Sequence, residues 1–296
     1  MTTVVGLLGF GRIGRNLFRI LYGRDDVRLA AISDWNDPEP LEYLLRFDTL
    51  LGRFPDEVSI REGNLYVAGR QIRMITGKQQ GQVPWGELGV DTVLEATSRG
   101  RTRAELEAHL QAGAKRVIAC SPPLEPPDIT AVIGVNDEKL ESRHRIVSNA
   151  SSTVHCLAPI AKLLHEAFGI ERAIYTTVHS YTNQHRLADV PADDMRQGRA
   201  AAENIIPQLS RSPGMVMEVV PELKGRVTGS AVAVPVRNGS AVDLVCWHSR
   251  KVTPVAINEV VRTAASTDRL PSTIWADRGP DASPSLLVSS PFRSAG

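Results

Sequence analysis

Ser152 and His179 have side chains that could together carry nucleophilic chemistry. Ser152 opens an apolar stretch of helical periodicity, and His179 follows a strand-like run. A serine at a helix N-terminus, with an imidazole as base and backbone amides as oxyanion donors, could attack a carbonyl carbon. Serine is also a preferred helix N-cap, and the sequence shows no carboxylate to orient His179. Capping is therefore the favoured role, and a Ser-His hydrolase is the alternative.

The glycines of Gly9-x-Gly11-x-x-Gly14 follow a strand-like run and open a helix. In that context glycines permit a tight turn and a close approach of a pyrophosphate to backbone amides. Asp34 follows Gly14 by twenty residues, at the end of the next predicted strand. A carboxylate there accepts hydrogen bonds from the ribose hydroxyls and repels a 2′-phosphate. The pattern predicts an NAD site and disfavours NADP.

The first half alternates short β-rich runs with helical stretches, which predicts a Rossmann-type doubly wound parallel sheet in an α/β fold. Helices are expected over 12–21 and 103–112, the latter closed by Gly113. The proline-rich stretch 121–128 predicts a loop. The expected strands cover residues 3–8, 27–34, 92–95, 117–120 and 146–148.

The pattern changes after Ser151. A long helix is expected over 152–168, ending at Gly169 and burying Leu157, Ile160, Leu164 and Phe168. Strand-like alternation over 170–178, 226–236 and 241–247 predicts an α+β domain with a larger, mostly antiparallel or mixed sheet. The polar stretch 180–200 is expected to be irregular.

Composition excludes several classes of protein. The 296 residues suggest two domains, and 34 basic against 33 acidic residues give a net charge of +1. This balance gives no general drive toward nucleic acid or membrane, although Arg99, Arg101 and Arg103 form a local basic run. No apolar run reaches the length of a membrane span and the N-terminus lacks the charged and apolar regions of a signal peptide, so a cytoplasmic location is expected. The three cysteines have no metal-site spacing and form no even disulfide set, so a reduced compartment and no metal are expected. Cys156 is predicted to be a small buried thiol.

Five segments in the same order resemble the phosphorylating glyceraldehyde-3-phosphate dehydrogenase family, over nearly the whole chain from Val4 to about Phe292. The segment 148–159, Ser-Asn-Ala-Ser-Ser-Thr-Val-His-Cys-Leu-Ala-Pro, resembles the active-site signature, with Ser152 where the family has its nucleophilic cysteine. The other matching segments are residues 6–16, 177–183, 199–207 and 221–225.

The resemblance implies a glycolysis-related NAD-dependent oxidoreductase in which a thiolate attacks an aldehyde, hydride passes to nicotinamide, and phosphate cleaves a thioester. It implies an NAD-binding domain over 1–151 and a catalytic domain over 152–296. His179 matches the family's base. The implied partners are a phosphate or sugar-phosphate ligand and a homo-oligomer, a tetramer by resemblance, or an assembly with a paralogue.

Cofactor residues follow from the resemblance. Arg12 and Ile13 match the pair that contacts the pyrophosphate, Lys78 stands where an adenine-proximal arginine is usual, and Thr97 matches a threonine at a strand end. Ser98 and Cys120 replace the usual glycine and serine.

The two phosphate sites of the family are matched unequally. For inorganic phosphate, Ser151 and Thr153 are present, Arg196 or Arg199 supplies charge, and Ser210 replaces a threonine. For the substrate phosphate, Thr182 is present but Ala233 replaces an arginine. Losing that guanidinium removes a contact of about 1.5–3 kcal/mol, for which Arg211 or Arg237 are the candidate substitutes.

Further departures surround the nucleophile position, where Val154 and His155 replace a threonine and an asparagine. The segment 287–292 resembles one that the family follows with a strand and a terminal helix, so the catalytic domain is expected to lack both. The sequence predicts an NAD-binding homologue whose phosphorylating oxidation is lost or strongly impaired, with a regulatory or pseudoenzyme role. The alternative is an active NAD-dependent dehydrogenase in which Ser152 is an engineered or tolerated substitution.

Overall fold

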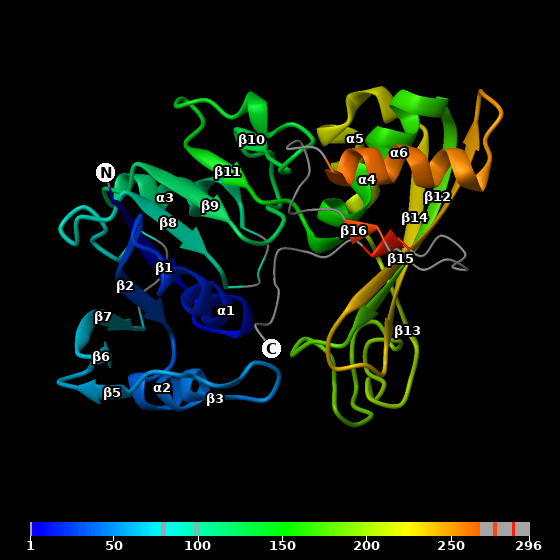
Figure 1. Ribbon diagram of the computed structural model, residues 1–296. Coiled ribbons are helices and arrows are strands. Elements are labelled where there is room, and N and C mark those ends of the chain that lie inside the picture. The colour runs from blue at the N-terminus through cyan, green and yellow to red at the C-terminus, as the bar shows by residue number, and fades with distance from the viewer. Residues whose placement is uncertain are drawn as a thin grey trace. The chain divides into compact units, whose positions relative to one another are not determined.

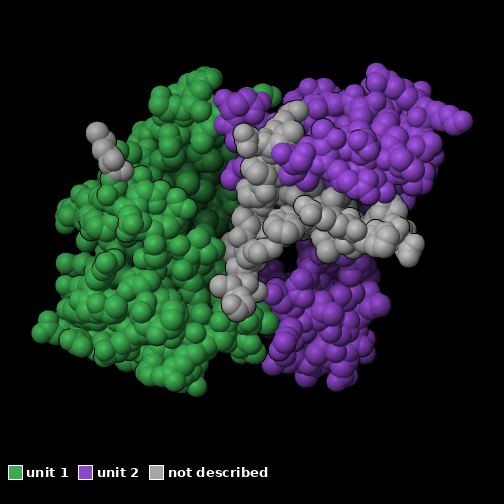
Figure 2. Space-filling view, in the orientation of Figure 1, with its two compact units in different colours: residues 1–131, 139–151 green, residues 132–138, 152–296 purple. Residues whose placement is uncertain are grey.

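The computed structural model describes residues 2–77, 81–97, 99, 101–266, 275–276 and 286–287. The chain forms two compact units (Figure 2). The first comprises Met1–Ala131 and Lys139–Ser151, and the second Val132–Glu138 and Ser152–Gly296. Lys78 and Ser98, and most of the segment from 287 to 292, lie outside the described residues.

The first unit is built on a sheet that, in the described residues, has nine strands in the order β10-β11-β9-β8-β1-β2-β7-β6-β5 (Figure 1). The strands from β10 to β7 in that order are all parallel. The sheet order reverses between β1 and β8, and this reversal confirms the predicted doubly wound topology. The strands are β1 (Thr3–Leu8), β2 (Val27–Asp34), β5 (Val58–Arg61), β6 (Asn64–Val67), β7 (Arg70–Thr76), β8 (Thr92–Glu95), β9 (Arg116–Ala119), β10 (Ile129–Thr130) and β11 (Ile146–Ser148).

Two tight hairpins extend this sheet in an antiparallel sense through β5, β6 and β7, beyond the strands predicted from the sequence. Glu62 and Gly63 have φ of 50° and 71°, and Ala68 and Gly69 have φ of 46° and 80°. Two successive positive φ values define the type I′ turn, whose twist matches that of a β-hairpin. Glycine at the second position of each turn is the sequence signal for them.

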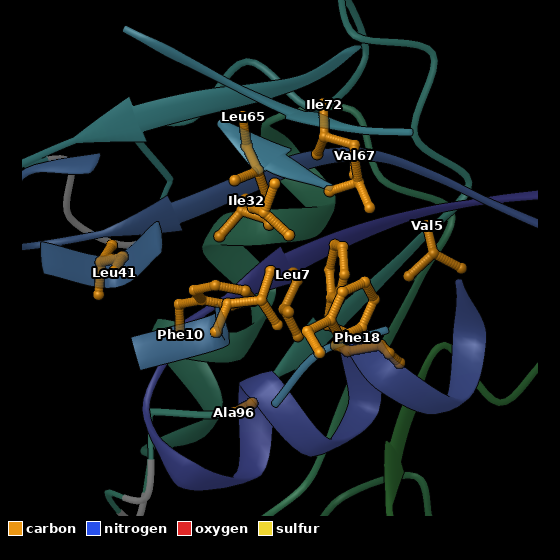
Figure 3. Close-up of a cluster of buried hydrophobic side chains, with 14 residues drawn as sticks. Val5, Leu7, Phe10, Phe18, Ile32, Leu41, Leu65, Val67, Ile72 and Ala96 are labelled. Carbon is orange, nitrogen blue, oxygen red and sulfur yellow. The ribbon is translucent and has the colours of Figure 1, made fainter. Parts of the chain in front are cut away.

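Helices pack on the sheet through apolar side chains (Figure 3). Phe18 of α1 (Arg12–Leu21) is fully buried and stacks edge-on against Phe10, with ring centroids 5.6 Å apart. Leu7 of β1 and Ile32 of β2 complete this cluster from the sheet. The other elements of the unit are α2 (Pro38–Arg46), α3 (Arg103–Gln111) and the short pair β3 (Phe47–Asp48) and β4 (Gly52–Arg53); a 3-10 turn, Asp137–Lys139, spans the two units.

The second unit contains the predicted mixed sheet, which in the described residues has four strands in the order β13-β14-β12-β15. β12 pairs parallel with β14 and antiparallel with β15. α4 and α5 contact this sheet, and α6 packs on α4. The strands of this sheet are β12 (Ile170–Ser180), β13 (Ile206–Gln208), β14 (Val227–Val234) and β15 (Ser240–His248). The helices are α4 (Ser152–Phe168), α5 (Ser212–Val219) and α6 (Pro254–Ser266), with a 3-10 helix η2 (Pro221–Leu223). β16 (Trp275–Ala276) and β17 (Leu286–Leu287) form a separate pair.

The predicted long helix is confirmed with its bounds, and Leu157, Ile160 and Leu164 are buried while Phe168 is half-buried. β14 is shorter than the predicted 226–236 because Pro235 has no N–H to donate to a strand ladder. Among the described residues, no helix combines the length and the apolar character that crossing a membrane requires.

Candidate active site and cofactor site

The loop between β1 and α1 contains three glycines, and the surroundings of each explain differently why it has no side chain. Gly9 has a φ of +90°, and a Cβ there would lie 2.9 Å from backbone atoms of Thr97. A Cβ on Gly14 would lie 2.0 Å from the Gly9 carbonyl oxygen. A Cβ on Gly11 would meet nothing within 4 Å. The chain itself therefore requires Gly9 and Gly14, whereas Gly11 leaves open space in which a ligand phosphate can approach the backbone.

The N-terminus of α1 has no side-chain cap. Gly11 is the N-cap residue and offers no acceptor to the first turn of the helix. The amides of that turn and the positive end of the helix dipole suit a pyrophosphate. Arg12 and Ile13 begin this turn, and Ile13 also packs against the core.

Asp34 ends β2 with its carboxylate held in place. Oδ2 accepts a hydrogen bond from the Phe10 amide at 2.6 Å, and Oδ1 accepts bonds from the amide and side chain of Asn36 at 3.0 and 2.8 Å. The carboxylate is thereby tied to the residue that follows Gly9. This arrangement fits the ribose-binding role that the sequence predicts.

A buried ion pair organises the end of β8. The carboxylate of Glu95 is fully buried, and its Oε1 accepts hydrogen bonds from Thr97 Oγ1 and, at 3.3 Å, from Arg101 Nε. Arg101 also donates to Thr97 Oγ1 at 2.7 Å. The negative charge of Glu95 also acts on the neighbouring Cys120. Burial first, and this charge second, raise the pKa of the Cys120 thiol to about 12. Thr97 is thus fixed at the strand end, where the sheet order reverses.

Two of the three arginines considered for nucleic-acid binding, Arg101 and Arg103, form ion pairs within the fold. Arg101 is 8% exposed and pairs with Glu95 and Glu105. Arg103 pairs with Glu107 at 2.8 Å and with Asp128 at 2.7 Å. The charges of Arg101 and Arg103 are therefore compensated locally, whereas Arg99 is exposed.

The N-terminus of α4 presents Ser152 to solvent and Thr153 to the interior. Ala150, which is 1% exposed, has a φ of 50°, and the chain turns there into the helix. Ser152 is exposed, whereas Thr153 is 4% exposed. The Thr153 hydroxyl lies 3.3 Å from Nε2 of His179. Within the part of the chain that the structure describes, His179 hydrogen-bonds Thr153 and not Ser152.

His179 lies near the end of β12, between two hydroxyl groups. Its Nδ1 is 3.2 Å from Oγ of Ser240, the residue paired with it on β15. Burial lowers the pKa of His179, and the neighbouring His185 lowers it further. A neutral imidazole at pH 7 can accept a proton, as a general base must. Sequence reasoning missed Ser240, because only the strand register places it opposite His179.

Ala233 lies on β14 beside His179, and it is 1% exposed. Its other neighbour in the register is Ile206 on β13. With Ala201 and Tyr181 these residues form an apolar cluster. The position of the expected substrate arginine is therefore filled by apolar packing.

Thr182, predicted for the substrate phosphate, belongs to a second polar group whose other members, His185 and Gln208, sequence reasoning missed. The Thr182 amide donates to Nδ1 of His185 at 3.0 Å, and its hydroxyl lies 3.2 Å from the same atom. The other ring nitrogen of His185 contacts the Gln208 side chain on β13. We call Thr182, His185 and Gln208 the imidazole cluster.

The other residues predicted to bind phosphate lie directly before α4, at the start of α5 and in the segment 180–200. Ser210 lies 3.5 Å from the Tyr175 hydroxyl and accepts from the Ser212 amide at 3.3 Å, and Arg211 is the exposed N-cap residue of α5. Arg196 pairs with Asp194, and Arg199 with Asp189. Ser151, which precedes Ser152, is half-buried.

No cysteine offers an alternative thiolate. Burial raises the pKa of Cys156, and it raises that of Cys246 to about 11. A thiol must ionise to act as a nucleophile, so the raised pKa values of Cys120, Cys156 and Cys246 disfavour that role for all three. The described residues contain no group of three or more His, Cys, Asp or Glu side chains placed to hold a metal ion.

Family models match both units of the chain. Residues 3–103 match the NAD binding domain of glyceraldehyde 3-phosphate dehydrogenase, and residues 151–276 match its C-terminal domain. The match identifies the cofactor of the first unit as NAD.

Several bacterial glyceraldehyde-3-phosphate dehydrogenases are similar to this chain over most of its length. The glyceraldehyde-3-phosphate dehydrogenase of Geobacillus stearothermophilus is 46% identical over 90% of this chain and 79% of its own length. The glyceraldehyde-3-phosphate dehydrogenase of Streptomyces coelicolor is 45% identical, again over 90% of this chain and 79% of its own length. Glyceraldehyde-3-phosphate dehydrogenase 1 of Bacillus subtilis is 44% identical over 90% of this chain and 80% of its own. With both family models and relatives of this similarity, the chain belongs to the glyceraldehyde-3-phosphate dehydrogenase family of NAD-binding oxidoreductases.

Proposed function

We propose that this chain binds NAD but has lost, or retains only weakly, the phosphorylating oxidation of an aldehyde, and that it serves in ligand binding, regulation or assembly with an active paralogue. The observation that carries the proposal is the hydroxyl of Ser152 at the start of α4, where the family signature has a cysteine. Ala233 supports it, because an apolar side chain occupies the place of the substrate arginine.

A serine hydroxyl is a weaker nucleophile than a cysteine thiol, which is why the oxidation is expected to be lost or weak. A thiol is partly ionised near neutral pH and is ionised further at a helix N-terminus, whereas a serine must lose its proton to a base during attack. His179 is the candidate base, yet its Nε2 is engaged with Thr153. An oxygen ester also resists cleavage by phosphate more than a thioester does.

An active dehydrogenase is the second candidate, and the retained His179 favours it. Its lowered pKa leaves the imidazole neutral at pH 7 and able to accept a proton. A Ser-His hydrolase has weaker support, since Nδ1 of His179 faces the Ser240 hydroxyl where such enzymes commonly use a carboxylate.

NADH formation from glyceraldehyde 3-phosphate, with NAD and phosphate or arsenate, tests the proposal directly. We expect the absorbance at the NADH band to stay at the level of the blank. Turnover near the ordinary enzyme rate of about 10 per second would refute the loss of activity.

Restoring the thiol tests whether the surrounding site is still assembled. We expect Ser152→Cys to give a thiol that reacts rapidly with iodoacetamide below pH 7, and Ser152→Cys with His179→Asn to react more slowly. A weak dehydrogenase activity should appear and should rise when Ala233→Arg is added. Alkylation at the rate of an ordinary cysteine, unaffected by His179, would mean that Ser152 is a helix cap only.

A homo-oligomer, or an assembly with a paralogue, is part of the proposal. Leu187, Met195 and Leu209 in or beside the irregular segment are 86%, 87% and 95% exposed. Val245 and Trp247 leave a second apolar area on the open face of the sheet. Exposed apolar side chains in such numbers are typical of interaction surfaces. Light scattering after size-exclusion chromatography would measure the assembly, and a monomer at micromolar concentration would contradict it.

A further inference from the structure

The glycine loop, residues 9–14, packs directly against the main chain at the end of β8, the strand beside β1 (Figure 1). A Cβ on Gly9 would lie 2.9 Å from the Ala96 carbonyl carbon and from the nitrogen and Cα of Thr97. The Ala96 amide also donates a hydrogen bond to the Leu8 carbonyl at 2.8 Å. Because glycine has no side chain that could adjust, a shift of the Thr97 main chain would displace the loop.

The opposite side of the loop is fixed by β2. The Gly9 amide donates to the Ser33 carbonyl at 2.8 Å, and the Phe10 amide donates to Oδ2 of Asp34 at 2.6 Å. Gly9 thus lies between the ends of β2 and β8, the strands on either side of β1. Nucleotides bind at this edge of a doubly wound sheet, so the groups that fix the two strand ends also fix the backbone that meets the phosphates.

Glu95 and Arg101 hold Thr97 in place through both its amide and its hydroxyl. Oε1 of Glu95 accepts hydrogen bonds from the Thr97 amide at 3.3 Å and from the Thr97 hydroxyl. Arg101 donates to the same Oε1 at 3.3 Å and to Thr97 Oγ1 at 2.7 Å. A threonine hydroxyl has one proton, and here Glu95 accepts it. The Thr97 hydroxyl therefore fixes the strand end and has no proton left for a ligand.

Burial makes this arrangement one of geometry more than of stability. Glu95 and Arg101 are 0% and 8% exposed, and Oε2 of Glu95 has no hydrogen-bond partner among the described residues. A buried ion pair contributes little net stability compared with well-packed apolar residues, because both charges lose their water. Buried polar networks instead hold the groups that they join in one arrangement.

We propose that Glu95 and Arg101 are positioning residues for NAD. They hold the Thr97 main chain against Gly9, and this contact sets the backbone amides of the glycine loop for the pyrophosphate. Both residues act through Thr97, and the Thr97 hydroxyl acts within this group and not on the cofactor. The inference rests on the proposed function in one respect, namely that the first unit binds NAD.

Titration of the full chain with NAD tests the positioning role. Arg101→Met and Thr97→Val each remove a group that fixes Thr97, and each should weaken NAD binding about tenfold, within the range by which residues that do not touch a ligand change its affinity. Thr97→Ser restores the hydroxyl and should recover most of the affinity that Thr97→Val loses. Arg103→Met removes an equal charge from the start of α3, where Arg103 pairs with Asp128, and should change nothing.

Hydrogen exchange without NAD separates positioning from stability. In Arg101→Met and Thr97→Val the Gly9 amide should exchange about fivefold faster relative to the amides in the middle of β1, because the loop opens locally. Val58→Ala is the control for lost stability, since Val58 is 5% exposed and lies on β5 at the far edge of the same sheet. It should lower the urea midpoint and leave both the exchange ratio and the NAD affinity unchanged.

Three results would overturn the inference. An unchanged NAD affinity in folded Arg101→Met would show that the ion pair does not act on the cofactor site. An equal loss in Arg103→Met or Val58→Ala would assign the effect to general charge or to stability. A loss in Thr97→Val without faster Gly9 exchange would assign the Thr97 hydroxyl to direct contact with NAD. Thr97→Val leaves the ion pair in place, so its affinity and exchange decide the question if Arg101→Met does not fold.

The exchange measurement also distinguishes this inference from the proposed function. If the unmodified chain bound no NAD, the proposed function would fail, whereas the exchange experiment contains no cofactor and would still be decisive. Faster Gly9 exchange in both variants would then support the link between the ion pair and the glycine loop. An unchanged exchange ratio in both variants would overturn it.

Discussion

The imidazole of His179 and the hydroxyl of Ser240 face each other across β12 and β15, with Nδ1 and Oγ 3.2 Å apart. Thr153 approaches the other ring nitrogen from α4 at 3.3 Å. The ring is held from both sides by neutral groups, so its tautomer depends on hydroxyl orientation and not on a carboxylate. Ser240 is therefore the residue that we expect to position His179.

Removing the Ser240 hydroxyl should slow any chemistry that uses His179 as a base. In a Ser152→Cys background, Ser240→Ala should reduce the alkylation rate about fivefold, the effect of a neutral hydrogen bond of about 1 kcal/mol. Ser230→Ala is the control, because its hydroxyl lies 3.4 Å from Thr176, away from His179. Equal rates in both variants would show that Ser240 does not position the ring.

Asp34 should decide between the two nicotinamide cofactors. Isothermal titration should show NAD binding more tightly than NADP, because the carboxylate at the end of β2 repels a 2′-phosphate. Asp34→Ser should narrow this preference and also weaken NAD, since Oδ2 accepts the Phe10 amide beside the glycine loop. NADP binding as tightly as NAD in the unmodified chain would remove Asp34 from this role.

Arg101 should be more important to stability than an exposed arginine. Arg101→Met would leave the fully buried carboxylate of Glu95 without its cation and should cost about 3–5 kcal/mol of unfolding free energy. The double variant Glu95→Gln with Arg101→Met should recover part of that loss. Urea denaturation measures both.

The exposed pair of Arg143 and Glu141 provides the control for this comparison. Arg143→Ala should leave the urea midpoint unchanged, because exposed ion pairs contribute little. If Arg101→Met were as stable as that control, the buried pair would have no structural role.

His109 should make the first unit less stable in mild acid. The ring is fully buried, its Nδ1 accepts from Trp85 Nε1 at 3.1 Å, and burial lowers its pKa to about 4. An unfolded histidine has a pKa of about 6.5, so the unfolded chain binds the extra proton between the two values. Stability from this group is complete above pH 6.5 and falls by about 3 kcal/mol as the pH decreases to 4.

Trp85 fluorescence during urea unfolding at several pH values measures this effect. His109→Gln should be less stable at pH 7 but should lose less stability between pH 6.5 and 4 than the unmodified chain. His144→Gln serves as the control and should keep the original slope. An unchanged slope in His109→Gln would mean that other groups cause the acid sensitivity.

The sequence by itself determined the elements and the cofactor. Hydrophobic periodicity placed β1, α1, β2 and α4 with the bounds that the structure has, because local patterns of burial fix where such elements begin and end. The spacing from Gly9 to Asp34 predicted NAD, because one strand-turn-helix-strand unit brings both to the same edge of the sheet. The two hairpins of β5 to β7 also have a local signal, a glycine at the second position of each turn.

Only the tertiary structure decided which side chains meet around His179. Ser240 is 61 residues from His179, and Gln208 is 23 residues from His185, so neither pairing has a local signal. A shift of one residue in the β12–β15 register would turn a different side chain toward the ring, because alternate residues of a strand face opposite sides of the sheet. The pairing of β14 with β12 and β13 likewise places Ala233 in its apolar cluster beside His179.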